Sequence, residues 1–273
     1  MVVPPNSHPL AGCRAKIARA EETLSGLARD VAAFLESPPY RIVRQHQDGG
    51  LEYAFIAYGE PRPPLRFAVL AGEIIHHLRS SLDHVVHALV LRNGRTPTLT
   101  NQFPICTTAK AFQLACDRGQ IKGVGASAAG LIEAAQPFTS QAPDDTILHV
   151  VGQYDNTDKH RLLVVVATIV RLGSTVNVGV DEQILAARPE RGGKPPAIVA
   201  LGDPAPRELT RDGVVVFTIR LEEPAPEFTA DAQFVPQVAF QQCGRIKLAP
   251  VVDTLRHLIA GTRRTVESFA TEF

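Results

Sequence analysis

The stretch GEIIHHLRSSLDHVVHALVL, from Gly72 to Leu91, decides the fold. At about 100° per residue, its pattern predicts a helix with two faces. The apolar face holds Ile74, Ile75, Leu78, Leu82, Val85, Val86 and Leu89. The polar face, within roughly a third of the circumference, holds Glu73, His76, His77, Ser80, Asp83, His84 and His87, with Arg79 beside it.

This polar face indicates a functional site. It carries four of the nine histidines of the chain. A solvated helix face more often carries Lys and Glu, which favour helices and do not titrate near neutrality. Clusters of titratable groups are typical of functional sites.

The composition excludes several classes. Lys plus Arg and Asp plus Glu each number 28, which argues against an extended nucleic-acid surface but allows a local basic site. The four cysteines form no C-x-x-C pair, so we expect neither a disulfide framework nor a cysteine zinc site, and a cytoplasmic location. Met1 to Leu10 shows no secretion-signal pattern, and the longest apolar run, Leu162 to Val170, is too short for a membrane span.

Outside the central stretch, periodicity and turn signals predict the remaining elements. The hairpin is expected around the turn Asp48-Gly49-Gly50. Helices are expected at Ala11–Leu35, Leu65–Leu91, Thr108–Asp117, Ser127–Ala135, Asp144–Tyr154 and Pro250–Ala270. Strands are expected at Tyr40–Gln45, Leu51–Tyr58, Leu162–Val170, Thr175–Val180, Ala197–Leu201, Val214–Leu221 and Phe234–Gln241.

These elements predict an α+β fold: a helical bundle with a small N-terminal β-hairpin and a C-terminal antiparallel β layer, closed by a C-terminal helix. Residues 1–170 form the mainly helical domain, and residues 171–273 form a β-rich region plus the closing helix. The boundary is soft, and one compact unit is the alternative.

A second polar cluster, DNTDKHR at Asp155–Arg161, follows the helix that is expected to end at Tyr154. One interpretation is a capped, solvated turn. The other is that it faces the polar side of the central helix, because it directly precedes an apolar strand.

Three kinds of site remain open from the residues. The carboxylate–histidine spacings favour a zinc, iron or manganese site in a metal-dependent hydrolase or oxygenase. Its ligands would come from Glu73, His76, His77, His84, His87 and Asp158. A non-catalytic ligand- or partner-binding protein is another class, in which the cluster holds helices or two subunits in register. The third, a metal-free catalytic site, is what the second of the two resemblances below implies.

Several motifs resemble those of an uncharacterised bacterial family. Its members carry a helix of the form H-x-L-R-S-x-L-D-H and a later N-x-D-K-H-R motif, and here these lie at 76–84 and 156–161. The segments FPI at Phe103–Ile105 and AAQPF at Ala134–Phe138 extend the likeness over approximately residues 10–170. His77 stands where the family has Asn. The likeness indicates membership but implies no activity.

A looser resemblance is to HEPN domains, helical modules of bacterial toxin and defence ribonucleases. Their signature is Arg, four to six residues, then His, which Arg79 and His84 match. The resemblance implies metal-independent RNA cleavage without a cofactor. His84 would be the general acid or base and Arg79 the phosphate contact. The supporting residues would be His76, Asp83, Asp158, Lys159 and His160. The expected partners are RNA at a local site and a second copy of the chain, as a homodimer.

Overall fold

The computed structural model describes residues 8–36, 40–171, 177–179, 196–225, 229–231, 233–243 and 246–273. Its α-helices are α1 (Ala11–Glu36), α2 (Leu65–Arg92), α3 (Ala109–Asp117), α4 (Ala126–Ala134), α5 (Ile147–His160) and α7 (Val251–Ser268). Its strands are β1 (Arg41–Gln47), β2 (Glu52–Tyr58), β3 (Val165–Arg171), β4 (Asn177–Gly179), β5 (Ile198–Leu201), β6 (Arg207–Glu208), β7 (Val214–Leu221), β8 (Thr229–Asp231), β9 (Phe234–Cys243) and β10 (Ile246–Pro250). The predicted α+β class is confirmed.

The chain forms two compact units, each assembled from separate segments. The helical unit comprises Met1–Val31, Pro64–Val165 and Phe240–Phe273, and the sheet unit comprises Ala32–Pro63 and Val166–Ala239. The expected soft boundary between two domains near residue 170 stays a prediction.

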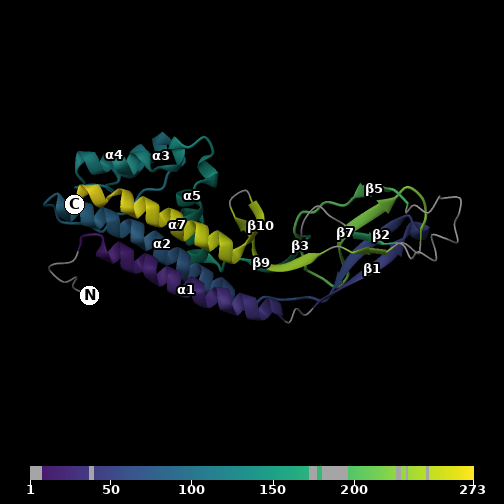
Figure 1. The fold of residues 1–273 in the computed structure, drawn as a ribbon. Coiled ribbons are helices and arrows are strands. Elements are labelled where there is room, and N and C mark those ends of the chain that lie inside the picture. Colours follow the sequence, from purple (N-terminus) through teal and green to yellow (C-terminus); the bar gives the residue numbers. More distant parts are fainter. Residues whose placement is uncertain are drawn as a thin grey trace. The chain divides into compact units, whose positions relative to one another are not determined.

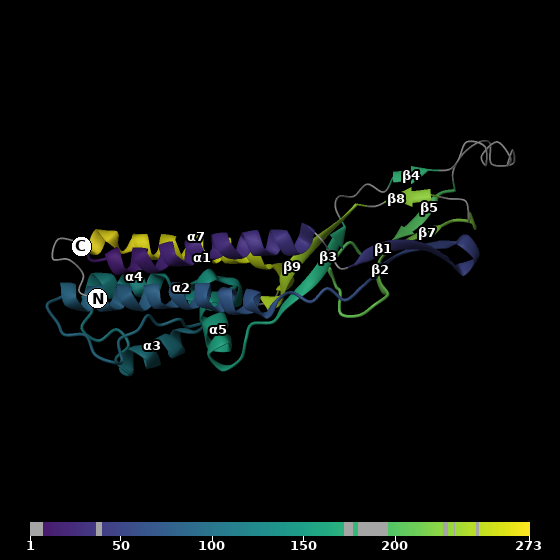
Figure 2. The ribbon, with the colours of Figure 1, turned by 90° about the horizontal axis from the view of Figure 1, so that it is seen from below.

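Helix α2 lies at the centre of the helical unit. The apolar residues predicted to face the core are all buried, and Ile74, Ile75 and Leu78 are inaccessible to solvent. Helix α2 packs against α5 and α7, and α1, α2 and α7 run side by side in Figures 1 and 2. Burial on several sides explains why small residues such as Gly72 also occur along α2.

The closing helix α7 packs against α1, as predicted. Arg14 of α1 holds Glu267 with two hydrogen bonds, Nε to Oε1 at 2.8 Å and Nη2 to Oε2 at 2.6 Å. Glu21 of α1 forms an ion pair with Arg263 of α7, with 2.7 Å between Oε1 and Nη2. These polar contacts flank a buried apolar seam that includes Leu24 and Ile259.

The predicted N-terminal hairpin is confirmed. Strands β1 and β2 pair antiparallel from Arg41 opposite Tyr58 to Gln47 opposite Glu52, and Gly49 in the turn has a positive φ of 64°. The hairpin belongs to a sheet of order β1-β2-β7-β5, and a second sheet has the order β10-β9-β3-β6. The core of the sheet unit includes Tyr53, Phe217 and Ile219.

Two predicted boundaries were wrong around α5. The helix begins at Ile147, where the Thr146 hydroxyl accepts from the His149 amide, and Asp144 and Asp145 lie in a 3-10 turn instead. It then continues past Tyr154 to His160. No Gly or Pro interrupts Asp155–His160, so this polar sequence extends the helix rather than forming a turn.

Most other boundaries lie within a few residues of their predictions. Part of the expected strand Thr175–Val180 is β4, and the rest of it lies outside the described residues. In the described ranges, no helix combines the length and apolar composition that a membrane span requires.

Candidate functional site

The polar face of α2 divides into two rows that face different neighbours. His76, Arg79 and Asp83 are spaced three and four residues apart and are directed toward α5 and the loop at Phe103. His77 and His84, seven residues apart, lie on the side of α1. The predicted single stripe is therefore two surfaces.

Asp155 of α5 is the centre of the first surface. Its side chain is only 5% exposed, and its Oδ1 lies 3.3 Å from Nδ1 of His76. Its Oδ2 lies 2.6 Å from Nζ of Lys159, one turn later on α5. The two polar clusters therefore meet, through an aspartate that the sequence analysis had not selected as a site residue.

This arrangement sets the chemistry of His76. When neutral, its Nδ1–H donates to the Asp155 carboxylate, which leaves Nε2 as a proton acceptor. The His76 side chain is 61% exposed, so Nε2 is accessible to a ligand. A carboxylate that holds the far nitrogen of an imidazole is the arrangement that general-base histidines use.

Arg79 and Asp83 form a closed group with the backbone of Phe103. Arg79 Nη2 donates to the Phe103 carbonyl at 2.8 Å and lies 3.0 Å from Asp83 Oδ1, which accepts from the Phe103 amide at 2.8 Å. Burial raises the pKa of the Asp83 carboxyl, while Arg79 and the Phe103 amide lower it. The Nη1 atom of Arg79 is buried and has no hydrogen-bond partner in the described part of the chain.

Gln136 holds the extended segment that includes Phe103 in place. Its side chain is buried, accepts from the Cys106 amide at 3.0 Å, and donates to the Pro104 carbonyl at 2.9 Å and the Ile132 carbonyl at 3.0 Å. The segments FPI and AAQPF are thus parts of one support.

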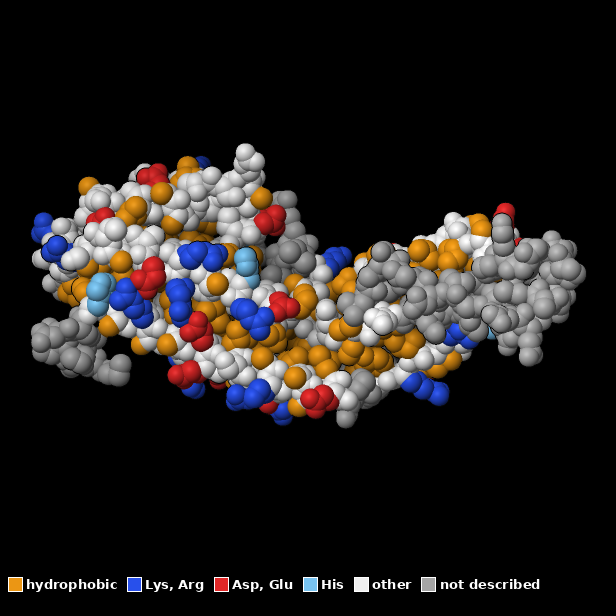
Figure 3. All heavy atoms as spheres, in the orientation of Figure 1, with side chains coloured by type: hydrophobic (Ala, Val, Ile, Leu, Met, Phe, Trp, Pro, Cys, Tyr) orange, Lys and Arg blue, Asp and Glu red, His pale blue; other side chains and the backbone are white. Residues whose placement is uncertain are grey.

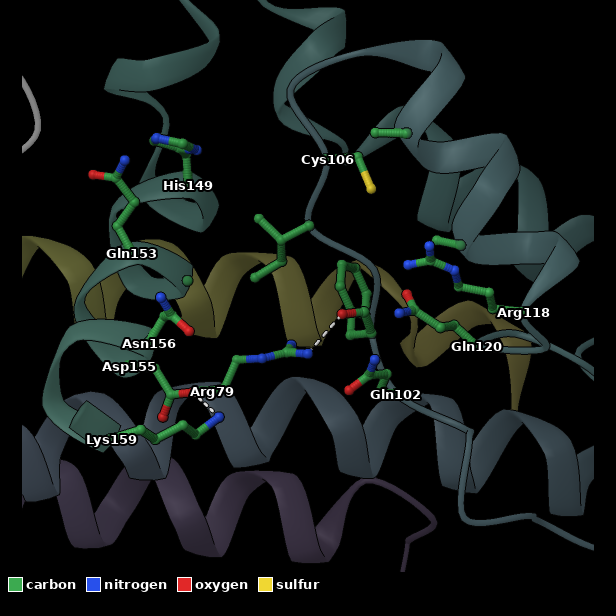
Figure 4. A pocket seen from close by; sticks show the side chains of 15 residues that line it. Arg79, Gln102, Cys106, Arg118, Gln120, His149, Gln153, Asp155, Asn156 and Lys159 are labelled. Atoms are coloured by element: carbon green, nitrogen blue, oxygen red, sulfur yellow. Dashed lines mark hydrogen bonds and ion pairs between the residues drawn. The ribbon is translucent and has the colours of Figure 1, made fainter.

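These elements enclose a pocket of about 510 Å³, which we call the first pocket. Figure 4 shows Arg79, Asp155 and Lys159 on one side and Arg118 and Gln120 on the other. Asp155 is the one acidic residue in its lining, against three Lys or Arg residues. The full lining is Arg79, Gln102, Phe103, Ile105, Cys106, Ala111, Ala115, Arg118, Gln120, His149, Gly152, Gln153, Asp155, Asn156 and Lys159.

Asp158 supports the contact between α2 and α5. A methyl group at Gly72 would overlap both carboxylate oxygens of Asp158 and come within 2.5 Å of its Cγ, so only glycine allows this approach. The pKa of Asp158 is raised by burial and by the nearby Asp155, and His76 opposes this shift. Among the described residues, Asp158 Oδ1 is buried and has no hydrogen-bond partner.

The second surface holds His77 and His84 beside α1. A Cβ at Gly12 of α1 would lie 3.3 Å from Nδ1 of His84. Burial lowers the pKa of both histidines, and the Lys16 ammonium lowers both further. His84 is not in the lining of the first pocket, so the Arg79–His84 spacing does not bring these two side chains to one pocket in this chain.

The remaining candidate residues are solvent-facing. Glu73, His87 and His160 are exposed. Among the described residues, no three His, Cys, Asp or Glu side chains come together in a way that could hold a metal ion. The predicted ligand set does not fit a single metal site. His76 of α2 and Asp158 of α5 lie between these two helices, whereas His77 and His84 lie on the side of α2 that faces α1.

The sequence analysis gave no role to Asp155, Gln136 or Arg118. A helical interpretation of residues 155–160 would have revealed Asp155, because it places Asp155 and Lys159 four residues apart on one face. Arg118, Gln102 and Gln120 lie outside the helices and carry no periodic signal. Comparisons with protein-family models, curated proteins and solved structures find no match.

The basic character of the first pocket is local. On the face drawn in Figure 3, Lys and Arg side chains of the helical unit alternate with Asp and Glu side chains. The whole chain likewise carries 28 residues of each sign. The pocket therefore favours a compact anion, such as a phosphate group, over a broad polyanionic surface.

Proposed function

We propose that the chain is a metal-independent ribonuclease of the HEPN-like toxin or defence type, with its active site at the first pocket. The supporting observation is the buried Asp155, which contacts His76 and Lys159 beside a guanidinium with an unpartnered nitrogen. The resemblance of the Arg79-x4-His84 motif to HEPN domains supplies the choice of RNA. Arg79 keeps its expected role at the phosphate, and the acid–base role moves from His84 to His76.

The proposed reaction uses the RNA's own 2′-hydroxyl. His76 Nε2 takes the proton of the 2′-hydroxyl, whose oxygen attacks the adjacent phosphorus. The P–O5′ bond breaks, the leaving oxygen takes a proton from water, and the products are a 2′,3′-cyclic phosphate and a 5′-hydroxyl. Arg79 and Lys159 stabilise the negative charge that develops on the phosphate oxygens. Asp155 orients His76 by holding its Nδ1 atom.

The test is cleavage of single-stranded RNA in EDTA, with the products analysed for a cyclic phosphate. His76→Ala is expected to lower kcat by about 10²- to 10⁴-fold, the usual contribution of a general base. Asp155→Asn is expected to lower kcat and to change KM much less. His257→Ala removes an exposed histidine of α7 and serves as the matched control.

Three outcomes would overturn parts of this proposal. Loss of cleavage in His84→Ala, with activity retained in His76→Ala, would return the acid–base role to His84. Cleavage that EDTA abolishes and an added metal ion restores would refute the metal-independent mechanism. Binding without cleavage by the folded protein would identify a ligand-binding protein instead.

A further inference from the structure

A second cavity of about 390 Å³ lies next to the first, and we call it the second pocket. Gln153 and Asn156, three residues apart on one side of α5, line both pockets. The two pockets therefore adjoin at these two side chains. The lining of the second pocket is Gln153, Tyr154, Asn156, Thr157, Arg161, Leu163, Val164, Phe240, Gln241 and Gln242.

The second pocket is polar, and the part of the chain that the structure describes contributes no acidic residue to its lining. Among the described residues of its lining, the cation is Arg161, an exposed residue just beyond the last turn of α5. The two pockets together are lined by four Lys or Arg residues and one Asp, in a chain whose charges balance at 28 of each sign. This local excess suits a ligand with more than one phosphate.

Carboxamides give the second pocket its other character. The carboxamides of Gln153 and Asn156 each carry donors and an acceptor, the combination that reads the edge of a nucleobase. Base stacking has no platform in this pocket. Its two aromatic residues, Tyr154 and Phe240, are buried against each other with their ring centroids 4.9 Å apart.

We propose that the second pocket is a subsite for the nucleotide adjacent to the cleaved phosphate. Arg161 contacts the next phosphate along the strand, and the amides of Gln153 and Asn156 contact the adjacent base. This assignment rests on the proposed ribonuclease function and deepens it, because it defines the substrate as a strand that extends past the scissile bond across α5.

The test measures binding of uncleavable 2′-O-methyl RNA, as a dinucleotide and as a hexanucleotide, by fluorescence anisotropy at several salt concentrations. The wild-type chain is expected to bind the hexanucleotide more tightly. Arg161→Gln is expected to weaken hexanucleotide binding about threefold to fivefold, the effect of one exposed ionic contact. It should also reduce the slope of the logarithm of the binding constant against the logarithm of the salt concentration by about 0.7, the value for one phosphate contact on a single strand.

Two comparisons make the test specific. Dinucleotide binding should be unchanged in Arg161→Gln, and Arg264→Gln, which removes an exposed α7 arginine outside both pockets, should change neither affinity. Equal weakening of both oligonucleotides by Arg161→Gln, or no weakening of either, overturns the subsite even if the protein cleaves RNA. Length-dependent, Arg161-dependent binding without cleavage in EDTA instead supports the subsite and overturns the ribonuclease. No binding of either oligonucleotide overturns both.

Discussion

Unequal exposure around Asp155 leads to a prediction about stability. The Asp155 side chain is 5% exposed, whereas those of Lys159 and His76 are 56% and 61% exposed. Removing the buried carboxylate leaves the Lys159 ammonium and the His76 imidazole in contact with water. Removing the exposed ammonium in Lys159→Met leaves the carboxylate buried, with only the longer 3.3 Å contact to His76. The two substitutions should therefore differ in cost, although they break the same ion pair.

The magnitudes follow from these surroundings. A buried charged acceptor that loses a partner costs about 1–3 kcal/mol, so we expect Lys159→Met to lower the free energy of unfolding by about 2 kcal/mol. Asp155→Asn should cost about 0.5–1 kcal/mol, because its partners are exposed. In the Asp155→Asn background, Lys159→Met should cost under about 0.5 kcal/mol. The coupling free energy is thus about 1.5 kcal/mol, or roughly tenfold in the folding equilibrium.

The assay is urea unfolding of the wild type, both single variants and the double variant. Circular dichroism at 222 nm is the signal, because the chain has no tryptophan. The control cycle uses Arg19 and Glu22 of α1, an ion pair at 3.2 Å with side chains 61% and 69% exposed, for which a coupling of about 0–0.5 kcal/mol is expected. A coupling at Asp155–Lys159 no larger than the control would refute the argument from burial.

Two further predictions concern titration. Lys16→Gln should raise the pKa of His84 in an NMR titration, because the Lys16 ammonium is the second-largest cause, next to burial, that lowers this pKa. Arg19→Gln is the control. An unchanged pKa in Lys16→Gln would contradict the placement of His84 beside α1. The pKa of Glu267 is lowered chiefly by its hydrogen bond to Arg14 of α1. The stability that this carboxylate contributes to the fold is therefore fully present above the ordinary glutamate pKa of about 4.3, and it is lost as the pH falls through the lowered value. Glu267→Gln should therefore flatten the acid side of a plot of Tm against pH, and identical plots would exclude a stabilising role.

The class of fold could be predicted because long amphipathic helices and a glycine-containing turn leave strong local signals. The apolar positions of the central helix, such as Ile74 and Leu82, were identified from periodicity alone and are buried. The pairing of β2 with β7 joins strands far apart in the sequence, so no local pattern indicates it. The end of α5 was misplaced because polar residues were taken as the sign of a turn, whereas tertiary packing, which buries Asp155, overrides their modest helix propensity.

The candidate site was located but not resolved by the sequence. Helical periodicity grouped the histidines on one side of α2, yet a difference of one residue, as between His76 and His77, rotates a side chain by about 100° and directs it toward another neighbour. Which neighbour each one meets depends on the packing of α1 and α5, and that packing depends on close contacts such as Gly72 with Asp158. Sequence spacing alone carries no information on such contacts.

The interleaving of the two units has a consequence for the order in which the chain folds. The helical unit is interrupted twice by segments of the sheet unit, so α2 is synthesised long before α7, which packs against it. Until α7 emerges from the ribosome, part of the apolar surface of α2 remains uncovered. Contacts between such distant segments form slowly, because the intervening chain must first close into a loop. The interval between the synthesis of α2 and that of α7 is therefore when the nascent chain is most exposed to aggregation and most dependent on chaperones.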